Sequence, residues 1–295
     1  MLDRSLLDPW SVDIGGDMAL PLIGFGTYDI AVEATYDAVR VALDAGYRHI
    51  DTAYGYANEA EIGRALADSR IPRDEVFLTT KVPSRRIGHE DETVANSLRG
   101  LRTDHVDLWL IHDPPAGDAS IRLWQRFIDL RERGLARTIG VSNYTTEQLD
   151  ALVAATGVTP AVNQIRWTPA LHDPARASQL ARRGVQLEGF SAIRRTNLAD
   201  PVLTKIAADH GVTAAQVVLR WHLEHRYVTL PRSTNPDHIR ENLDLWGFGL
   251  TSGEVAAIDA LSTIVTADRP AGPGAARPLL WAPAERFADT ASAER

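Results

Sequence analysis

Four polar side chains in this sequence are of the types that could together move a proton onto a carbonyl oxygen: Asp51, Tyr56, Lys81 and His112. Each lies at the end of a short apolar segment or a few residues after it. A lysine buried beside a carboxylate stays protonated, because the carboxylate compensates for the lost hydration. Lys81 beside Asp51 would therefore place a positive charge next to Tyr56.

The chemistry depends on how far that charge shifts the tyrosine. An isolated tyrosine has a pKa of about 10, so a proton donor near neutral pH needs its pKa lowered by about 2 to 3, which corresponds to about 3 to 4 kcal/mol. One positive charge at about 4 Å supplies roughly that much at an effective dielectric constant of about 20. With His112 donating a hydrogen bond to the same oxygen, this tetrad predicts an acid that protonates a carbonyl oxygen as hydride reaches the carbon.

The elements that must position the tetrad are visible as eight short segments, rich in apolar and β-branched residues, that alternate with segments of helical periodicity. The strand candidates are residues 20–28, 47–53, 76–82, 106–112, 136–143, 161–167, 186–192 and 227–233. The helix candidates include residues 91–102, 121–133, 146–155 and 174–183, and the last three are closed by a glycine. This alternation is typical of βαβ units, and eight of them predict an α/β fold, a closed (β/α)8 TIM barrel.

The ends of the chain are predicted to complete this barrel. Residues 11–20 are expected to form a β-hairpin with Gly15, Gly16 and Asp17 at its turn, closing the floor of the barrel. The whole chain, residues 1–295, is predicted to be a single domain, since such a barrel uses about 250 residues. Residues 264–295 are expected to form a tail or a flap over the active site.

In such a barrel the functional groups lie at the C-terminal ends of the strands and in the loops that follow. The residues expected there are Gly26, Thr27, Tyr28, Asp51, Tyr54, Tyr56, Lys81, His112, Asp113, Ser142, Asn143, Gln164, Phe190, Arg232 and Ser233. Taken singly, each has an ordinary structural explanation, such as a helix cap, a charge on the rim or a buried histidine. The tetrad taken together is what favours catalysis.

The composition excludes several classes of function. A formal net charge of −8 argues against binding to nucleic acid or to an anionic membrane. The N-terminal residues lack the apolar stretch of a secretory signal and the apolar runs are too short to cross a bilayer, so we expect a cytoplasmic protein. The absence of cysteine excludes disulfides and thiol chemistry. No metal site is expected, because His222 and His225 are three residues apart on a helix with no third ligand evident.

The order of seven motifs resembles that of the aldo-keto reductase superfamily along nearly the full length of the chain. The motifs are GFGTY (24–28), GYRHIDTAYGYANE (46–59), LTTKVP (78–83), DLWLIHDP (107–114), IGVSNY (139–144), VNQI (162–165) and LPRSTNPDHIRENL (230–243). The similarity is to prokaryotic-type members of the 2,5-diketo-D-gluconate reductase kind. It implies a reversible, NADPH-dependent reduction of aldehydes or ketones to alcohols, in which Tyr56 donates the proton with help from the rest of the tetrad.

The resemblance also implies where the nicotinamide end of the cofactor lies. Phe190 falls where the family usually has the tyrosine that stacks on the nicotinamide ring, and a phenyl ring keeps that platform. Ser142, Asn143 and Gln164 fall on the residues that hold the carboxamide. Gly26 and Thr27 are also expected to contact the cofactor.

The phosphate site of the cofactor can be argued from the residues after the last strand. Arg232 and Ser233 precede Asn235 and Pro236, a helix cap followed by a proline suited to the first helical position. Anions bind at helix starts, because free N–H groups and the helix dipole point toward them.

The family usually has lysine at position 232 and often arginine at position 238, whereas this chain has Arg232 and His238. Arg232 keeps a charge for the adenosine 2′-phosphate, but a neutral His238 would hold it less firmly. NADPH is therefore the expected cofactor, and NADH is the alternative. Glu241 and Asn242 match the family's adenine contacts.

The substrate side departs further from the family. Asp113 follows the histidine of the tetrad where an aromatic residue is common. In the pocket its carboxylate would disfavour acidic substrates, unless it pairs with a nearby arginine. Tyr28, Tyr54 and Trp281 are expected to wall the pocket for a small carbonyl compound. The resemblance implies a monomer, with a dimer as the alternative.

Other readings of the sequence are weaker. Gly24 and Gly26 form only half of a dinucleotide-binding fingerprint, and the Ser142 motif lacks the final glycine of a hydrolase nucleophile elbow. A cofactor-binding, redox-sensing subunit with little turnover is the alternative from another functional class. The intact tetrad argues against it.

Overall fold

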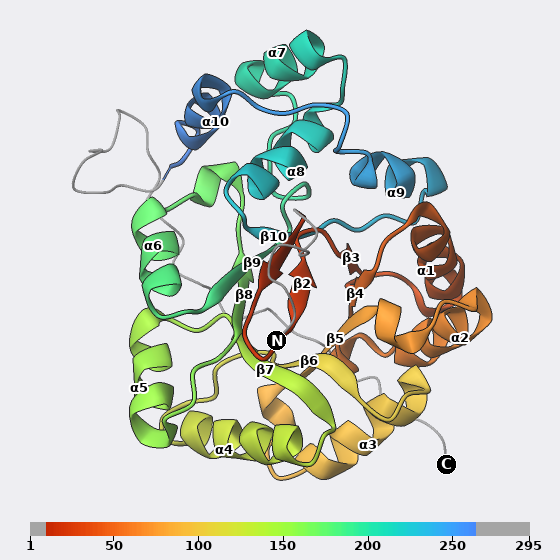
Figure 1. Ribbon diagram of the computed structural model, residues 1–295, viewed down its shortest axis with the longest axis vertical. Coiled ribbons are helices and arrows are strands. Elements are labelled where there is room, and N and C mark those ends of the chain that lie inside the picture. Colours follow the sequence, from red (N-terminus) through yellow and green to blue (C-terminus); the bar gives the residue numbers. More distant parts are fainter. Residues whose placement is uncertain (1–9, 264–295) are drawn as a thin grey trace, which may run out of the picture.

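The computed structural model describes residues 10–263 of the chain. Its centre is an eight-stranded parallel sheet in the order β10-β9-β8-β7-β6-β5-β4-β3. The strands are β3 (Phe25–Gly26), β4 (His49–Asp51), β5 (Phe77–Val82), β6 (Val106–Ile111), β7 (Ala136–Ser142), β8 (Val162–Arg166), β9 (Gln186–Phe190) and β10 (Val228–Leu230). A parallel bridge between Ile23 and Thr229 joins the two edge strands. The predicted (β/α)8 barrel is therefore confirmed (Figure 1).

Helices surround the barrel wall, as Figure 1 shows. They are α1 (Val32–Ala45), α2 (Glu59–Ser69), α3 (Glu90–Leu101), α4 (Ala119–Glu132), α5 (Thr146–Thr156), α6 (Pro174–Arg182), α7 (Pro201–His210), α8 (Ala214–Glu224), α9 (Pro236–Leu243) and α10 (Ser252–Asp259). Short 3₁₀ turns are η2 (Tyr54–Tyr56), η3 (Arg73–Glu75), η4 (Ser84–Arg86) and η5 (Pro169–Leu171). The four helices expected from periodicity are all present, with bounds within two residues of those predicted.

The strands form because they are buried on both faces. Every residue of β5 and β6 is buried, since one face of the sheet points into the barrel and the other packs under the helices. The helix ends follow local chemistry: Thr145, Thr213 and Thr251 each form a capping box with the residue three positions later. Gly157 ends α5 with a φ of 70°, a left-handed conformation that glycine adopts without steric cost.

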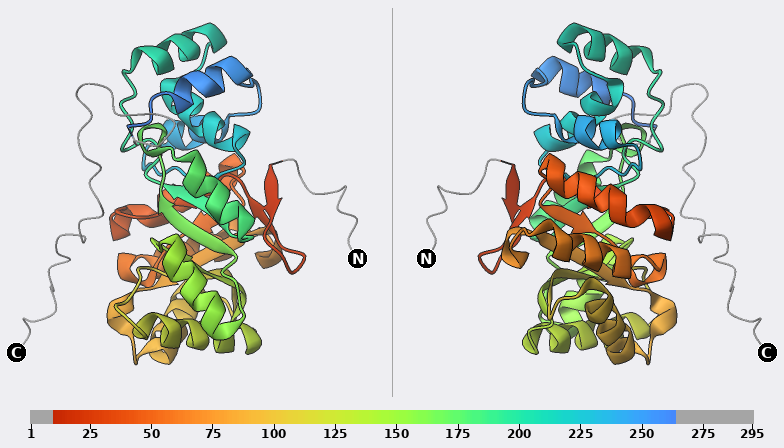
Figure 2. Two further views of the ribbon diagram at one scale, coloured as in Figure 1. Left: turned by 90° about the vertical axis from the view of Figure 1, so that its left-hand side faces the viewer. Right: turned by 90° about the vertical axis from the view of Figure 1, so that its right-hand side faces the viewer.

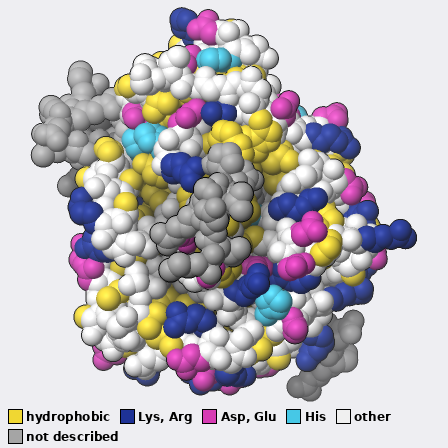
Figure 3. Space-filling model, viewed as in Figure 1, with side chains coloured by type: hydrophobic (Ala, Val, Ile, Leu, Met, Phe, Trp, Pro, Cys, Tyr) yellow, Lys and Arg dark blue, Asp and Glu magenta, His cyan; other side chains and the backbone are white. Residues whose placement is uncertain are grey.

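The predicted N-terminal hairpin is present as β1 (Ser11–Asp13) paired antiparallel with β2 (Ala19–Pro21). It lies across one end of the barrel (Figures 1 and 2). Arg226, just before β10, donates a hydrogen bond to the backbone oxygen of Ser11, so this end is the floor, where the strands begin. The face with the hairpin carries interspersed basic and acidic side chains around its rim (Figure 3).

The sequence also led to expectations about membrane-spanning segments and about the C-terminal residues. Among the helices of the described part, none is long and apolar enough to span a membrane. The predicted tail or flap, residues 264–295, and with it Trp281, lies outside the described residues.

Candidate active site

The barrel assembles the predicted tetrad at the C-terminal ends of three neighbouring strands. Asp51 ends β4, Lys81 is the penultimate residue of β5, and His112 directly follows β6. Tyr56 ends η2, the 3₁₀ turn after β4. Adjacent parallel strands end at the same edge of a sheet, so residues distant in sequence meet here.

The ammonium group of Lys81 connects the tetrad. Its Nζ donates hydrogen bonds to Asp51 Oδ1 at 2.6 Å and to the backbone oxygen of Thr52 at 2.8 Å, and lies 3.5 Å from Tyr56 Oη. The side chain of Lys81 is fully buried. Burial alone would lower the pKa of Lys81, but the negative charge of Asp51 raises it above its ordinary value. Lys81 therefore stays a cation.

Tyr56 differs from the expectation in one respect. Burial raises the pKa of Tyr56 to about 12, and the charge of Lys81 opposes this rise without cancelling it. The expectation that Lys81 brings this pKa down toward neutrality is wrong for this structure, because lost hydration outweighs the ammonium charge. A phenol with this pKa keeps its proton at neutral pH, and a strongly basic oxygen is needed to take it.

Two rings pack against Tyr56. The ring of Tyr28 lies 5.2 Å from it and the ring of His112 lies 5.6 Å from it, both edge-on. Burial lowers the pKa of His112 to about 3, and the charges of Lys81 and Arg85 act in the same direction. His112 is therefore neutral, and a neutral imidazole offers one N–H donor.

A buried network behind the tetrad was not anticipated from the sequence. Gln164 Nε2 donates to Asp51 Oδ2 at 2.8 Å and to Glu188 Oε2 at 2.9 Å. Glu188 is fully buried on β9, with Oε1 3.7 Å from His49 Nε2. Burial raises the pKa of Glu188 to about 8. The available signal was a glutamate inside a strand that the barrel buries.

The residues expected at the nicotinamide lie beside the tetrad. Asn143 has a φ of 64° and donates from Nδ2 to the backbone oxygen of His112 at 3.3 Å and to Ser142 Oγ at 3.0 Å. Ser142 Oγ in turn donates to the backbone oxygen of Gln164 at 2.9 Å. Asparagine tolerates this left-handed conformation better than most residues. The Ser142 hydroxyl and the Asn143 amide therefore lie together beside the backbone of Gln164, and such polar groups suit a carboxamide.

The loop after β3 fixes the backbone on the other side of Asp51. Thr27 donates from both its backbone nitrogen and its Oγ1 to the backbone oxygen of Asp51, each at 3.0 Å. At Gly26 a Cβ would lie 3.2 Å from the backbone oxygen of Leu230, so only a glycine fits without adjustment. Phe190 ends β9, opposite Leu230.

Comparison with known proteins shows the family to which this chain belongs. The sequence profile described as Aldo/keto reductase family matches residues 22–263. The chain belongs to the aldo/keto reductase family. It is 40% identical over 256 residues to 2,5-diketo-D-gluconic acid reductase B of Corynebacterium sp. (strain SHS752001), covering 85% of this chain and 92% of the relative. The resemblance stated from the motifs is confirmed.

Solved structures agree. The crystal structure of an aldo/keto reductase from Brucella melitensis superimposes with a TM-score of 0.82 at 37% identity, covering 85% of this chain and 99% of that one. An aldo-keto reductase of Bombyx mori in complex with NADP gives a TM-score of 0.78 at 29% identity, covering 85% of this chain and 92% of that one. This aldo/keto reductase is accordingly an NAD(P)H-dependent oxidoreductase, and NADPH is the cofactor of its family.

At the predicted phosphate site, this aldo/keto reductase holds two arginines around one carboxylate. Arg232 donates to the backbone oxygen of Asp29 at 3.1 Å and to its Oδ2 at 3.3 Å, and Arg194 donates to the same Oδ2 at 3.2 Å. Ser233 Oγ accepts a hydrogen bond from the backbone nitrogen of Asn235, the cap of α9. Two guanidinium groups share one carboxylate, which leaves a net positive charge near a helix start, so the donor set fits a phosphate.

The remaining adenine-side residues lie on α9. His238 is exposed, whereas Asn242 is buried. Glu241 Oε1 accepts a hydrogen bond from Thr213 Oγ1 at 2.7 Å. Asp29, Arg194 and Thr213 were not among the predicted site residues.

On the substrate side, Asp113 is held by η4. Its carboxylate accepts hydrogen bonds from the backbone nitrogen of Ser84 at 3.2 Å and from Ser84 Oγ. The guanidinium of Arg86 lies 5.6 Å from the ring of Tyr54, and Tyr28 is 46% exposed. Serine donors therefore bind the carboxylate for which an arginine partner was considered.

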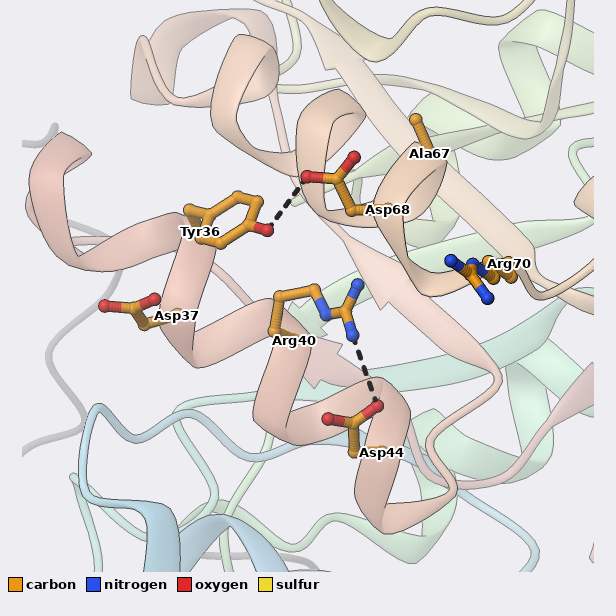
Figure 4. A pocket seen from close by; sticks show the side chains of 7 residues that line it. All are labelled: Tyr36, Asp37, Arg40, Asp44, Ala67, Asp68 and Arg70. Carbon is orange, nitrogen blue, oxygen red and sulfur yellow. Dashed lines mark hydrogen bonds and ion pairs between the residues drawn. The ribbon is translucent and has the colours of Figure 1, made fainter.

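A surface depression between α1 and α2 is lined by Tyr36, Asp37, Arg40, Asp44, Ala67, Asp68 and Arg70 (Figure 4). None of these was predicted as a site residue. Tyr36 donates a hydrogen bond to Asp68, and Arg40 pairs with Asp44.

The histidines considered for metal binding are separated. His222 is fully buried, with its ring nitrogens near the backbone oxygens of Val218 and Trp167. His225 instead meets His172 and Asp259. The expectation that His225 has no further ligand nearby is therefore wrong, because the fold brings His172 and Asp259 to it from distant segments.

Proposed function

We propose that this aldo/keto reductase reduces a small aldehyde or ketone reversibly to the alcohol, with Tyr56 as the proton donor. The position of Lys81 Nζ, 2.6 Å from Asp51 Oδ1 and 3.5 Å from Tyr56 Oη, carries the proposal. Bound NADPH supplies the hydride. As negative charge develops on the carbonyl oxygen, that oxygen becomes basic enough to take the proton from a phenol whose pKa is about 12.

Each member of the tetrad has a distinct role. The O–H bond of Tyr56 breaks, the O–H bond of the alcohol forms, and Lys81 stabilises the phenolate left behind. Asp51 keeps Lys81 charged and fixed. Neutral His112 donates its N–H to the substrate oxygen and so stabilises the developing charge. Solvent then restores the proton to Tyr56.

The carboxamide would be held by Ser142, Asn143 and Gln164, and the nicotinamide ring would be supported by Phe190. Arg232 would hold the 2′-phosphate, so we propose a preference for NADPH over NADH. The donor set described above supports this preference, and the exposed His238 weakens it. The cytoplasmic location and the monomeric state stay predictions from the sequence.

The test compares Tyr56→Phe with Tyr36→Phe, a matched change on α1, where Tyr36 Oη donates to Asp68. Oxidation of NADPH is followed with 4-nitrobenzaldehyde or methylglyoxal, and cofactor binding by fluorescence quenching. We expect Tyr56→Phe to lose roughly 10²- to 10⁴-fold in turnover, the usual contribution of a general acid, with cofactor binding nearly unchanged. Tyr36→Phe should keep turnover near that of the wild type.

Wild-type turnover in Tyr56→Phe would show that another group donates the proton. Tight cofactor binding by the wild-type protein without reduction of either aldehyde would favour the regulatory subunit instead.

A further inference from the structure

Three side chains capable of binding a metal meet outside the barrel. His172 follows η5, His225 follows the last residue of α8, and Asp259 ends α10. His172 Nδ1 lies 3.2 Å and His225 Nε2 lies 2.9 Å from Asp259 Oδ1. All three potential ligand atoms lie within 4.8 Å of one another. In Figure 1, α10 lies in the outer ring of helices, away from the barrel interior where the tetrad is built.

These distances are close to those of a tetrahedral zinc site. Ligand atoms at about 2.0 to 2.1 Å from a tetrahedral zinc ion are about 3.4 Å from one another. The 3.2 Å and 2.9 Å distances to Asp259 Oδ1 are within about 0.5 Å of that spacing. The two imidazole nitrogens lie within 4.8 Å of each other. Two imidazoles and one carboxylate suit a first-row transition-metal ion rather than magnesium, which prefers oxygen ligands.

The surroundings hold the three side chains in place. Trp221 Nε1 donates to Asp259 Oδ1 at 2.8 Å, which orients the carboxylate. Tyr227 Oη lies 3.5 Å from His172 Nε2, so the other ring nitrogen, Nδ1, is the one directed at the cluster. The ring of Tyr227 stacks on His225 at 5.0 Å. Partners of this kind orient ligands in metal sites.

Charge and access also suit a cation. Imidazoles that bind an ion through their lone pairs carry no charge, so this ligand set would supply one negative charge from the carboxylate. The side chains of His225 and Asp259 are 23% and 31% exposed, so solvent reaches the cluster.

We propose that His172, His225 and Asp259 bind a zinc ion, with water as the fourth ligand. The ion would fasten α10 to η5 and to the end of α8. Ser262 Oγ already donates to the backbone oxygen of His172 at 2.6 Å, and Thr263 donates to Ala170, so the chain after α10 is docked at the same place. The site is structural, and it does not depend on the proposed function.

The test uses full-length protein without a histidine tag, treated with EDTA and dialysed. Isothermal titration with zinc chloride should give one equivalent bound with micromolar or tighter affinity, and magnesium chloride should give none. At a zinc concentration 100-fold above Kd, the thermal midpoint should rise by about 4 to 5 °C for a protein of this size.

Two variants remove ligands in different ways. His225→Gln should abolish the zinc-dependent rise, and Asp259→Asn, which can still accept a hydrogen bond, should weaken zinc affinity at least about 10-fold. The matched control is His89→Gln, which changes an exposed histidine 3.5 Å from Glu92 and should bind zinc as the wild type does. Turnover with NADPH confirms that each variant is folded.

No zinc binding by the wild-type protein, or an unchanged zinc response in both His225→Gln and Asp259→Asn, would overturn the proposal. The three side chains would then form only a hydrogen-bonded contact.

Discussion

Glu188 is a titratable residue that the proposed proton transfer does not use. It is fully buried, accepts a hydrogen bond from Gln164 and is linked through that amide to Asp51. Burial raises its pKa from an ordinary 4.5 to about 8, and the nearby charge of Asp51 acts in the same direction. The folded protein therefore holds a proton here that the unfolded chain releases above about pH 4.5.

The sign of the effect on stability follows. Because the pKa of Glu188 is higher in the folded state, its contribution is most favourable below about pH 4.5 and is lost as pH rises toward 8. Glu188→Gln removes this loss and keeps an acceptor for Gln164. We expect the thermal midpoint of the variant, relative to wild type, to rise by several degrees between pH 5 and pH 8.5. Glu75→Gln, at an exposed position, should show no such trend, and parallel curves for Glu188→Gln and wild type would contradict the shifted pKa.

Residue types and strand ends were enough to predict that Asp51, Tyr56, Lys81 and His112 meet, and the structure brings them together. The pKa of Tyr56 could not be predicted in the same way, because it depends on how much water the folded barrel removes. The link from Asp51 through Gln164 to Glu188 was also missed. Hydrogen bonds between buried side chains depend on which faces of neighbouring strands point inward.

At the scale of elements, we expect the segment between β10 and α9 to determine the choice of cofactor. Arg232 lies in this segment, four residues before the first residue of α9, and its guanidinium bonds to Asp29. A 2′-phosphate would gain a charged, bidentate partner that a 2′-hydroxyl would not need. Cofactor preference should therefore depend on this one charge.

We expect Arg232→Gln to raise the KM for NADPH about 10-fold or more, equivalent to about 1.4 kcal/mol, with little change in the KM for NADH. The measurement is steady-state reduction of one aldehyde with each cofactor. Arg240→Gln, which removes an exposed arginine from α9 itself, is the control and should leave both KM values near wild type. Equal losses with NADPH and NADH in Arg232→Gln would mean that the arginine does not contact the 2′-phosphate.

Helices and long strands were predictable from periodicity and from their caps, as the capping box of α5 and its closing Gly157 illustrate. The 3₁₀ turns η2 and η4 were not predicted. A single turn has no repeating apolar pattern, yet η2 carries Tyr56 and η4 supplies the Ser84 donors to Asp113. The substrate side was therefore the least predictable part of the site.

At the scale of the whole molecule, closure of the barrel depends on the contact between its first and last strands. Thr229 donates from its backbone nitrogen to the backbone oxygen of Leu22 at 2.8 Å, and its own backbone oxygen accepts from Gly24 at 2.9 Å. These bonds use only main-chain atoms. Asp29 and Arg232, which lie just beyond this contact on either strand, can meet only because the barrel closes.

The side chain of Thr229 allows a test of whether main-chain bonds alone close the barrel. Thr229 is fully buried, and within residues 10–263 its Oγ1 has no hydrogen-bond partner, whereas Thr79 Oγ1 lies 3.1 Å from His49 Nε2. Valine has nearly the shape of threonine without the hydroxyl. Thr229→Val should therefore stabilise the protein by about 1 kcal/mol, and Thr79→Val should destabilise it by about 1 kcal/mol or more, in urea unfolding. A loss in Thr229→Val as large as that in Thr79→Val would show that the hydroxyl, and not the main chain alone, holds the barrel closed.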